Sequence, residues 1–315
     1  MTFDKTKVNR GETSSCGVKY QEILKQAIDL HVHIGPEMIP RKFTLPELIN
    51  YEKSKLRGVG VKNHFFPTIA MSGLSTRDEE ENLIVINSVV LNRYVGGFNP
   101  NIVRASAELS ERPIIVWFPT LHTERFLQSQ ETEIPEEWID PRLREKIKLR
   151  RSADIEPLSI FDDRNELTDE VKNIIGVVKE NGAILATGHL AWQDSYELVK
   201  FASDEMGIKK IIVTHPIYQK IAMPISIQKK LAQRGALIEH CYSMYSIDKI
   251  PMRKIAEQIK EVGVDNCILS SDVGQIFSKS PSESLADFIS LLLNEGVTKE
   301  EIKMMLIVNP GKLVL

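Results

Sequence analysis

Short apolar runs alternate with longer amphipathic segments along most of the chain. The runs are rich in Val, Ile or Leu and are bounded by Gly, Pro, Asn or Thr, which is typical of buried strands in a parallel sheet. The predicted strands are Ile28–Ile34, Gly58–Phe65, Val89–Gly96, Pro113–Pro119, Ala183–His189, Lys210–His215, Ala236–Cys241 and Cys267–Asp272.

The segments between these strands have the period of amphipathic helices, and several end at a glycine. The predicted helices are Leu45–Leu56, Pro100–Leu109, Thr168–Glu180, Ser195–Met206, Ile225–Gln233, Pro251–Val262 and Ser284–Asn294. Eight strands alternating with helices over about 280 residues predict an α/β fold, a single (β/α)8 TIM barrel over residues 1–315. A doubly wound open sheet is the alternative, but Gly35-Pro36 after the first strand does not resemble a Gly-rich phosphate loop.

Two segments depart from this rhythm. Residues 1–20 are polar and mixed in charge, and we expect them to form an N-terminal extension. Residues 121–166 form a long insertion after the fourth strand, with an acidic stretch followed by a basic one. The basic stretch is interpreted either as a solvated helix face or as a lid whose arginines meet an anionic substrate.

Composition narrows the classes of partner. The formal net charge is −3, which lacks the basic footprint of a nucleic-acid-binding protein. No stretch approaches the ~20 apolar residues that span a bilayer, and the N-terminus has no signal-peptide core. The three cysteines, Cys16, Cys241 and Cys267, suit neither a disulfide framework nor a CxxC zinc site. We therefore expect a cytoplasmic protein that acts on a small molecule and binds neither nucleic acid nor membrane.

All seven histidines fall at or just beyond the C-terminal end of a predicted strand. They are His31, His33, His64, His122, His189, His215 and His240. A barrel brings these strand ends together around one mouth, where barrel enzymes do their chemistry. Because imidazole is the commonest protein ligand of zinc and similar ions, this placement predicts a metal site at the C-terminal mouth.

The first strand carries the clearest signal. Simple alternation places Ile28, Leu30 and Val32 toward the helices. The same alternation turns Asp29, His31 and His33 toward the barrel interior. Two imidazoles two residues apart on one strand can share an ion, and Asp29, one layer deeper, could orient a ligand histidine.

On the second strand, Lys62 and His64 are expected to face the interior because Val59 and Val61 face the helices. A lysine inside a barrel is costly unless it is paired, modified or functional. We therefore treat Lys62 as a site residue that could bridge metals, bind substrate or donate a proton, with a buried salt bridge as the alternative.

Three later strand ends complete the predicted site, with His189 after the fifth strand, His215 after the sixth and Asp272 after the eighth. His122 and His240 could contact the ligands or substrate, or could simply be polar residues of the mouth. Glu239 and His240 are neighbours on one strand, so only one of them can face inward.

Asp29-Leu30-His31-Val32-His33, His189, His215, Ser271-Asp272 and the ending Asn309-Pro310-Gly311-Lys312-Leu313 resemble the pattern of the amidohydrolase superfamily. The resemblance implies a metal-dependent hydrolase in which His31, His33 and Asp272 bind one metal. It also implies that His189 and His215 bind a second metal, or that one binds while the other contacts substrate. The fourth strand lacks the bridging lysine or glutamate of two-metal members, so the chain resembles a subgroup with Lys62 and His64 on strand two instead.

The predicted cofactor is one or two divalent ions, with zinc favoured over manganese or iron. The predicted reaction is the cleavage of an amide, cyclic amide, lactone or related ester bond, with Asp272 as general acid–base and Lys62 or His64 stabilising an oxyanion. Three alternatives remain open, namely a metal-dependent decarboxylase or hydratase, a phosphoesterase and a non-catalytic barrel. Because barrels of this class are often dimers or larger, a homo-oligomer is expected.

Overall fold

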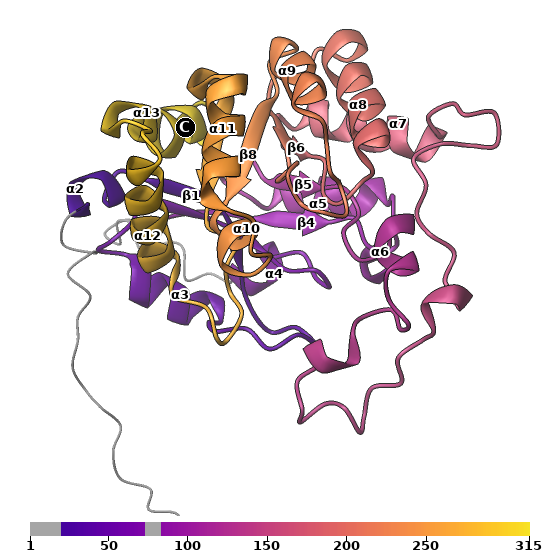
Figure 1. Cartoon of the computed structure of the whole chain (residues 1–315). Coiled ribbons are helices and arrows are strands. Elements are labelled where there is room, and N and C mark those ends of the chain that lie inside the picture. Colours follow the sequence, from indigo (N-terminus) through magenta and orange to yellow (C-terminus); the bar gives the residue numbers. More distant parts are fainter. Residues whose placement is uncertain (1–19, 73–82) are drawn as a thin grey trace, which may run out of the picture.

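The structure, a computed structural model, describes residues 20–72 and 83–315 (Figure 1). Most of the predicted N-terminal extension, residues 1–20, lies outside this range. The strands are β1 (Ile28–His33), β2 (Gly58–Lys62), β3 (Ile84–Ile86), β4 (Ser88–Val90), β5 (Ile115–Trp117), β6 (Ile184–Ala186), β7 (Ile211–Val213), β8 (Leu237–Cys241) and β9 (Cys267–Ser270).

The strands are parallel and close into a ring. β1 to β3 form one hydrogen-bonded sheet and β4 to β9 form a second. Only Asn87 separates β3 from β4, and the Ser88 hydroxyl donates to the Val61 carbonyl of β2 at 2.6 Å. At the other edge the backbone N–H of His33 donates to the Val273 carbonyl, just beyond β9, at 2.8 Å. With β3 and β4 counted as one interrupted strand, the described residues form the predicted eight-position barrel.

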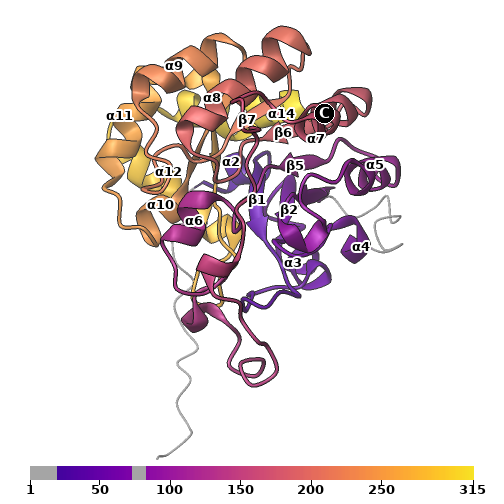
Figure 2. The same cartoon turned by 90° about the vertical axis from the view of Figure 1, so that its right-hand side faces the viewer.

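Helices surround this ring (Figures 1 and 2). They are α2 (Gln21–Leu24), α3 (Leu45–Glu52), α4 (Ile69–Ser72), α5 (Pro100–Glu108), α6 (Glu124–Gln128), α7 (Asp169–Glu180), α8 (Trp192–Lys200), α9 (Ile225–Gln233), α10 (Tyr242–Ser246), α11 (Met252–Val262), α12 (Pro281–Asn294), α13 (Lys299–Lys303) and α14 (Asn309–Val314). Within the described ranges, no helix combines the length and apolar character needed to cross a bilayer.

The predicted third strand, Val89–Gly96, is partly wrong. The strand begins earlier, at Ile84, and residues 91–96 form a turn around the short helix η2 (Arg93–Val95). The reason is Asn92, whose side-chain oxygen accepts hydrogen bonds from the backbone N–H groups of Thr120 (2.9 Å) and Leu121 (3.1 Å). These bonds tie the chain to the neighbouring strand end and stop it from continuing as a strand.

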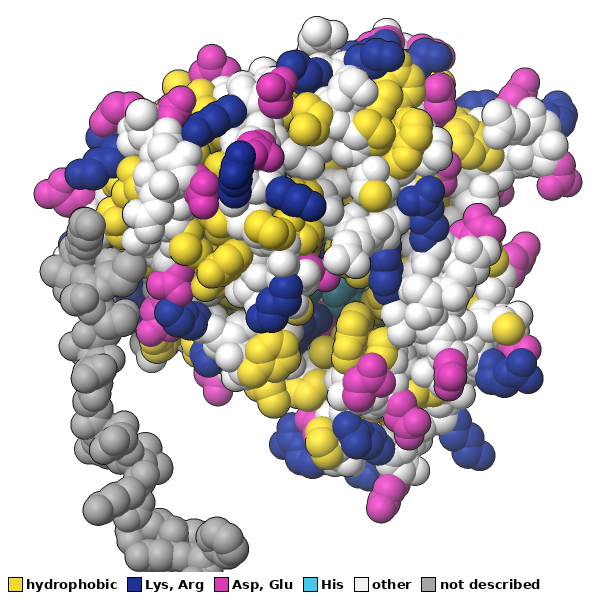
Figure 3. Space-filling model, viewed as in Figure 1, with side chains coloured by type: hydrophobic (Ala, Val, Ile, Leu, Met, Phe, Trp, Pro, Cys, Tyr) yellow, Lys and Arg dark blue, Asp and Glu magenta, His cyan; other side chains and the backbone are white. Residues whose placement is uncertain are grey.

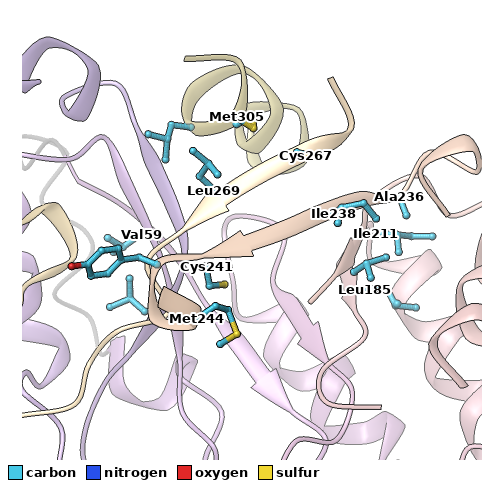
Figure 4. Close-up of a cluster of buried hydrophobic side chains, with 14 of the residues drawn as sticks. Val59, Leu185, Ile211, Ala236, Ile238, Cys241, Met244, Cys267, Leu269 and Met305 are labelled. Carbon is cyan, nitrogen blue, oxygen red and sulfur yellow. The ribbon is translucent and has the colours of Figure 1, made fainter. Parts of the chain in front are cut away.

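Apolar side chains fill two layers. An inner cluster within the barrel includes Ile28, Leu30 and Trp117, and Leu313 and Val314 of α14 pack into it. The Asn309 side chain donates to the Cys267 carbonyl at 2.8 Å, which holds α14 against the end where β9 begins. A larger outer cluster lies between strands and helices, and Figure 4 shows part of it around β8 and β9. The polar mouth is therefore the end opposite α14.

Simple alternation along β1 is wrong, because the pairing of β1 with β2 shifts register between Asp29 and Val32. Such a bulge puts one extra residue into one strand, so side chains before and after it change faces. Ile28 and Leu30 consequently lie in the inner cluster, whereas Val32 lies in the outer one. The predicted outward direction of Ile28 and Leu30 is therefore corrected.

Gly60 makes room for the bulge. A Cβ at this position would lie 2.5 Å from the Leu30 carbonyl oxygen, a distance that real side chains do not tolerate. Leu30 and His31 together occupy the irregular part of β1, so the close approach of Gly60 fixes how the first metal-ligand candidate is presented.

We predict that Gly60→Ala lowers the free energy of unfolding by about 2 kcal/mol, because the added methyl group meets backbone atoms. The matched control is Gly176→Ala on α7, where an added Cβ meets nothing within 4 Å and helix propensity favours alanine by about 1 kcal/mol. Urea unfolding followed by circular dichroism measures both variants. Equal stability of Gly60→Ala and the wild type would contradict the close approach.

Candidate metal centre

Two imidazoles of β1 contact one carboxylate oxygen just beyond the end of β9. Nε2 of His31 lies 3.1 Å from Oδ1 of Asp272, and Nε2 of His33 lies 2.9 Å from the same oxygen. Two ligands that share a zinc ion at about 2.1 Å lie about 3.4 Å apart, so each imidazole is close enough to Asp272 to share an ion with this carboxylate. His31 and His33 are buried, and the Asp272 side chain is 12% exposed.

The backbone fixes this arrangement. The N–H of Asp272 donates to the His31 carbonyl at 2.8 Å, where β9 closes the barrel against β1. Two residues later, a Cβ on Gly274 would lie 2.2 Å from the His33 carbonyl oxygen, and this glycine has a φ of +149°. A side chain at position 274 would push the Asp272 segment away from His33.

Asp272 is held in its charged form. Burial opposes ionisation, but the neighbouring His31 and His33 outweigh it and keep the pKa of Asp272 well below its usual range. Its second oxygen, Oδ2, accepts a hydrogen bond of 2.7 Å from the Ser243 hydroxyl. A carboxylate with one oxygen among imidazoles and the other on a hydroxyl is a suitable anionic ligand.

Glu239 of β8 orients His31 from the opposite side. Its Oε2 lies 3.2 Å from Nδ1 of His31, and its side chain is fully buried. Burial opposes the charge of Glu239, but the adjacent His31 outweighs it and lowers the pKa of this carboxyl. A carboxylate on Nδ1 leaves Nε2 as the nitrogen that can bind an ion, which is the usual arrangement of a metal-bound histidine.

Lys62 enters the centre from β2. Its Nζ lies 3.0 Å from Nε2 of His31 and 4.4 Å from the centre of the Trp117 ring. Burial lowers the pKa of Lys62, while Asp272 and Glu239 act in the opposite direction. Because Nε2 of His31 has a single lone pair, Lys62 and an ion compete for it, and ion binding requires Nζ to leave this nitrogen.

His189 and His215 stand across the mouth, with ring centres 5.1 Å apart, and His215 stacks at 5.8 Å from His31. Burial lowers the pKa of His189 and brings that of His215 to about 4, so both rings are neutral near pH 7 and can donate a lone pair. Among the described residues, Nδ1 of each is buried without a hydrogen-bond partner. Tyr218 packs against both rings at 5.4 and 5.5 Å.

His64 lies beside His33, with ring centres 4.8 Å apart. Its Nδ1 is 3.0 Å from the Thr120 hydroxyl, which in turn accepts a hydrogen bond of 3.0 Å from the Asn92 side chain. The Thr120 proton is then free for Nδ1 of His64, and this leaves Nε2–H as the donor of the ring.

Three residues named from the sequence lie apart from the donor atoms. Asp29 accepts from the backbone N–H groups of Ser271 (2.9 Å) and His31 (3.3 Å), so it stabilises the bulge rather than a histidine ring. His122 pairs through Nε2 with Glu133 at 3.0 Å. His240 alternates with Glu239 on β8 and therefore faces away from the barrel interior, as expected if only one of the two points inward.

Cys241 also approaches His31, with Sγ 4.0 Å from Nδ1, and His31, Cys241 and Asp272 have ligand atoms within 4.8 Å of one another. Two observations argue against this alternative set. One imidazole cannot direct Nδ1 and Nε2 to the same ion, and Asp272 lies at Nε2. Burial also raises the pKa of the Cys241 thiol well above its usual range, which disfavours the thiolate that binds metals.

A cavity of about 340 Å3 opens over the donor atoms. His33, His64, His189, His215 and Asp272 are among its lining residues, together with Tyr218 and Ser243. Predicted site residues from five strand ends are thus brought to one cavity.

Residues 26–239 match the sequence profile of a family described as "Family of unknown function (DUF6282)". The chain belongs to the DUF6282 family. Its sequence matches no curated protein.

Solved structures resemble this DUF6282 chain over nearly its whole length. An amidohydrolase from Pseudomonas aeruginosa has a TM-score of 0.62 at 10% identity, covering 95% of this chain and 98% of its own. The probable dipeptidase PvdM from the same organism has a TM-score of 0.61 at 10% identity, with 95% and 97% covered. A dihydroorotase from Campylobacter jejuni has a TM-score of 0.52 at 10% identity, with 92% and 83% covered. The predicted TIM barrel and the resemblance to the amidohydrolase fold are confirmed.

Sequence reasoning missed several residues of this DUF6282 site. From the sequence, Glu239 was noted only as the neighbour of His240, and no local pattern indicated which of the two faces the barrel interior. Ser243 and Tyr218 lie in segments that follow β8 and β7, and their sequence surroundings carry no pattern that points to a metal. Arg41 lines the cavity from the loop after β1, where it pairs with Glu37 at 2.7 Å.

Glu133 ties the start of the insertion to its basic stretch. This carboxylate binds His122 and also Arg150, which lies 2.6 Å away. Burial opposes its charge, but the hydrogen bonds from His122 and Arg150 outweigh it and lower the pKa of Glu133 to about 2. Its stabilising contribution is thus complete above the ordinary pKa of 4.5 and is lost as pH falls toward 2.

We predict that Glu133→Gln is less stable than the wild type at pH 7 and loses less stability between pH 4.5 and 2, because glutamine does not titrate. Urea unfolding at several pH values measures this. The control is Glu180→Gln, which removes an exposed ion pair with Arg104 and should follow the wild-type profile. Parallel pH profiles for Glu133→Gln and the wild type would contradict the prediction.

Proposed function

We propose that this protein is a metal-dependent hydrolase that cleaves an amide, cyclic amide, lactone or related ester bond in a small molecule. The observation that carries the proposal is the meeting of Nε2 of His31, Nε2 of His33 and Oδ1 of Asp272, at separations of 3.1 and 2.9 Å from that oxygen, under an open cavity. The confirmed amidohydrolase fold supports it.

The donor set fits a zinc-like ion. His31, His33 and Asp272 would hold one ion, and the neutral rings of His189 and His215 would complete its surroundings or hold a second. When bound, a divalent ion lowers the pKa of water and polarises the oxygen of the scissile group.

The chain itself moves the proton. Asp272 is ionised and lines the cavity, so one of its oxygens can take a proton from the attacking water and deliver it to the leaving nitrogen or oxygen. Ser243 holds Oδ2 at 2.7 Å and so limits the rotation of the carboxylate between these two steps.

Lys62 and His64 are the candidate hydrogen-bond donors to negative charge on the substrate. Lys62, once displaced from His31, presents Nζ to negative charge that develops on the substrate. His64 presents Nε2–H, because its Nδ1 is engaged by Thr120. Donors placed before the reaction stabilise an oxyanion at little reorganisation cost.

The structure gives no support to the alternative of a basic lid that binds a carboxylated substrate for decarboxylation. Arg142 pairs with Asp140 and its side chain is 87% exposed, while Arg150 pairs with Glu133. The described basic residues 142–151 do not line the cavity.

We predict that purified protein carries close to stoichiometric divalent metal and that His31→Ala and His33→Ala each lose it together with hydrolysis. Inductively coupled plasma mass spectrometry and a panel of amides, lactones and esters measure both effects. The control is His240→Leu, which removes an imidazole on the opposite face of β8 and should keep metal and activity. Activity of His31→Ala without metal would refute the scheme.

We predict that Lys62→Met lowers kcat on any substrate that the wild type hydrolyses by about 100-fold, with metal content unchanged, because an oxyanion donor is lost. Lys220→Met is the matched control, since Lys220 also lies over an aromatic ring, Phe126, at 4.3 Å, whereas Lys62 reaches Nε2 of His31. An unchanged kcat, or loss of metal, in Lys62→Met would contradict the role of Lys62.

A further inference from the structure

The outer part of the cavity is apolar, in contrast to its polar floor. Phe277, Ile276 and Trp138 all line it and are 76%, 59% and 40% exposed. Single exposed apolar residues are ordinary, but large ones that gather at one opening mark a binding surface. Figure 3 shows a histidine at the bottom of a hollow, with hydrophobic and basic side chains around the opening.

These apolar side chains come from separate elements and are held in place. The loop with Ile276 and Phe277 pairs with the loop after β1. The N–H of Lys42 donates to the Gly274 carbonyl at 2.7 Å, and the backbones of Arg41 and Gln275 form an antiparallel β-bridge. Because the two loops are held together by backbone hydrogen bonds, their side chains line the cavity and the loops do not fill it.

The insertion supplies the opposite wall. Leu121, Phe126 and Trp138 line the cavity, and Leu121 and Phe126 belong to a buried cluster with Ile134 and Ile139. The insertion therefore contributes apolar surface to the cavity, whereas its arginines point elsewhere.

Charge at the outer cavity disfavours an anionic occupant. Arg41 is neutralised by Glu37, whose side chain is fully buried, at 2.7 Å. Glu137 and Asp248, which also line the cavity, are acidic. Among the described lining residues acidic side chains outnumber basic ones, so a carboxylate in this region would meet mostly like charges.

We infer that the substrate carries a neutral apolar group, an acyl chain or aromatic ring, that lies against Phe277, Ile276 and Trp138 while the scissile bond lies at the His33–Asp272 floor. This inference rests on the proposed function for the position of the scissile bond. A cavity of about 340 Å3 is within the range that holds small-molecule ligands.

Binding of three hydroxamates tests the inference without knowledge of the bond cleaved. Acetohydroxamate, octanohydroxamate and the monohydroxamate of suberic acid share a metal-chelating head and differ in tail length and terminal charge. Isothermal titration calorimetry measures their affinities for zinc-loaded and metal-free protein. Octanohydroxamate should bind at least about tenfold more tightly than acetohydroxamate, since several methylene groups leave water, and the terminal carboxylate should remove most of this gain.

Phe277→Ser should reduce the preference for the octanoyl tail about threefold or more, while Phe66→Ser should leave it unchanged. Phe66 is the matched control because it is 54% exposed but does not line the cavity. Both positions are exposed, so thermal melting should show intact folding for each variant.

The outcomes separate the two proposals. A tail preference in both protein forms with no gain from zinc supports the apolar site and overturns the metal-dependent function. A gain in affinity from zinc, with equal affinity for short and long tails, supports the metal-dependent function and overturns the apolar site. Equal, weak binding throughout overturns both. Sedimentation of the wild type as an oligomer that Phe277→Ser dissociates would assign the surface to a second copy and overturn the inference.

Discussion

The shared contact of one carboxylate oxygen with two imidazoles is the constraint on which the site depends. Oδ1 of Asp272 lies 2.9 Å from His33 and 3.1 Å from His31, and the same residues close the barrel through backbone hydrogen bonds between β1 and the end of β9. Closure of the fold and assembly of the donor atoms are therefore one event. A change that breaks the pairing of β1 with the end of β9 separates the ligands. A change that removes the ligand side chains leaves buried charge uncompensated at the same place.

The burial of two carboxylates would favour a cation at this centre. Asp272 and Glu239 are carboxylates with little or no exposure, and Lys62 provides one nearby positive charge. Two buried negative charges and one positive charge leave an imbalance that a low-dielectric interior penalises. A divalent ion held by His31, His33 and Asp272 would offset it, and Lys62 would then be free to face the substrate.

The strand-end histidines could be predicted because a barrel converts a one-dimensional pattern into a shared mouth, and His31, His33, His64, His189 and His215 all reach it. The β1 bulge could not be predicted, since it depends on the close approach of Gly60 to Leu30 across two strands. Glu239 could not be separated from His240, because alternation gives opposite faces without saying which is inward. The contribution of the insertion could not be predicted either. Its arginines pair with acidic residues of the same segment, such as Asp140 and Glu133, instead of facing the cavity. Its apolar residues reach the cavity only through three-dimensional packing.

We expect His31, His33 and Asp272 to surround one ion. Anomalous diffraction at the zinc absorption edge, from crystals grown with zinc, tests it most directly. We predict a peak within about 2.3 Å of both Nε2 atoms and a carboxylate oxygen of Asp272. A peak at Cys241 without His33, or no peak at the mouth of a zinc-loaded crystal, would contradict it.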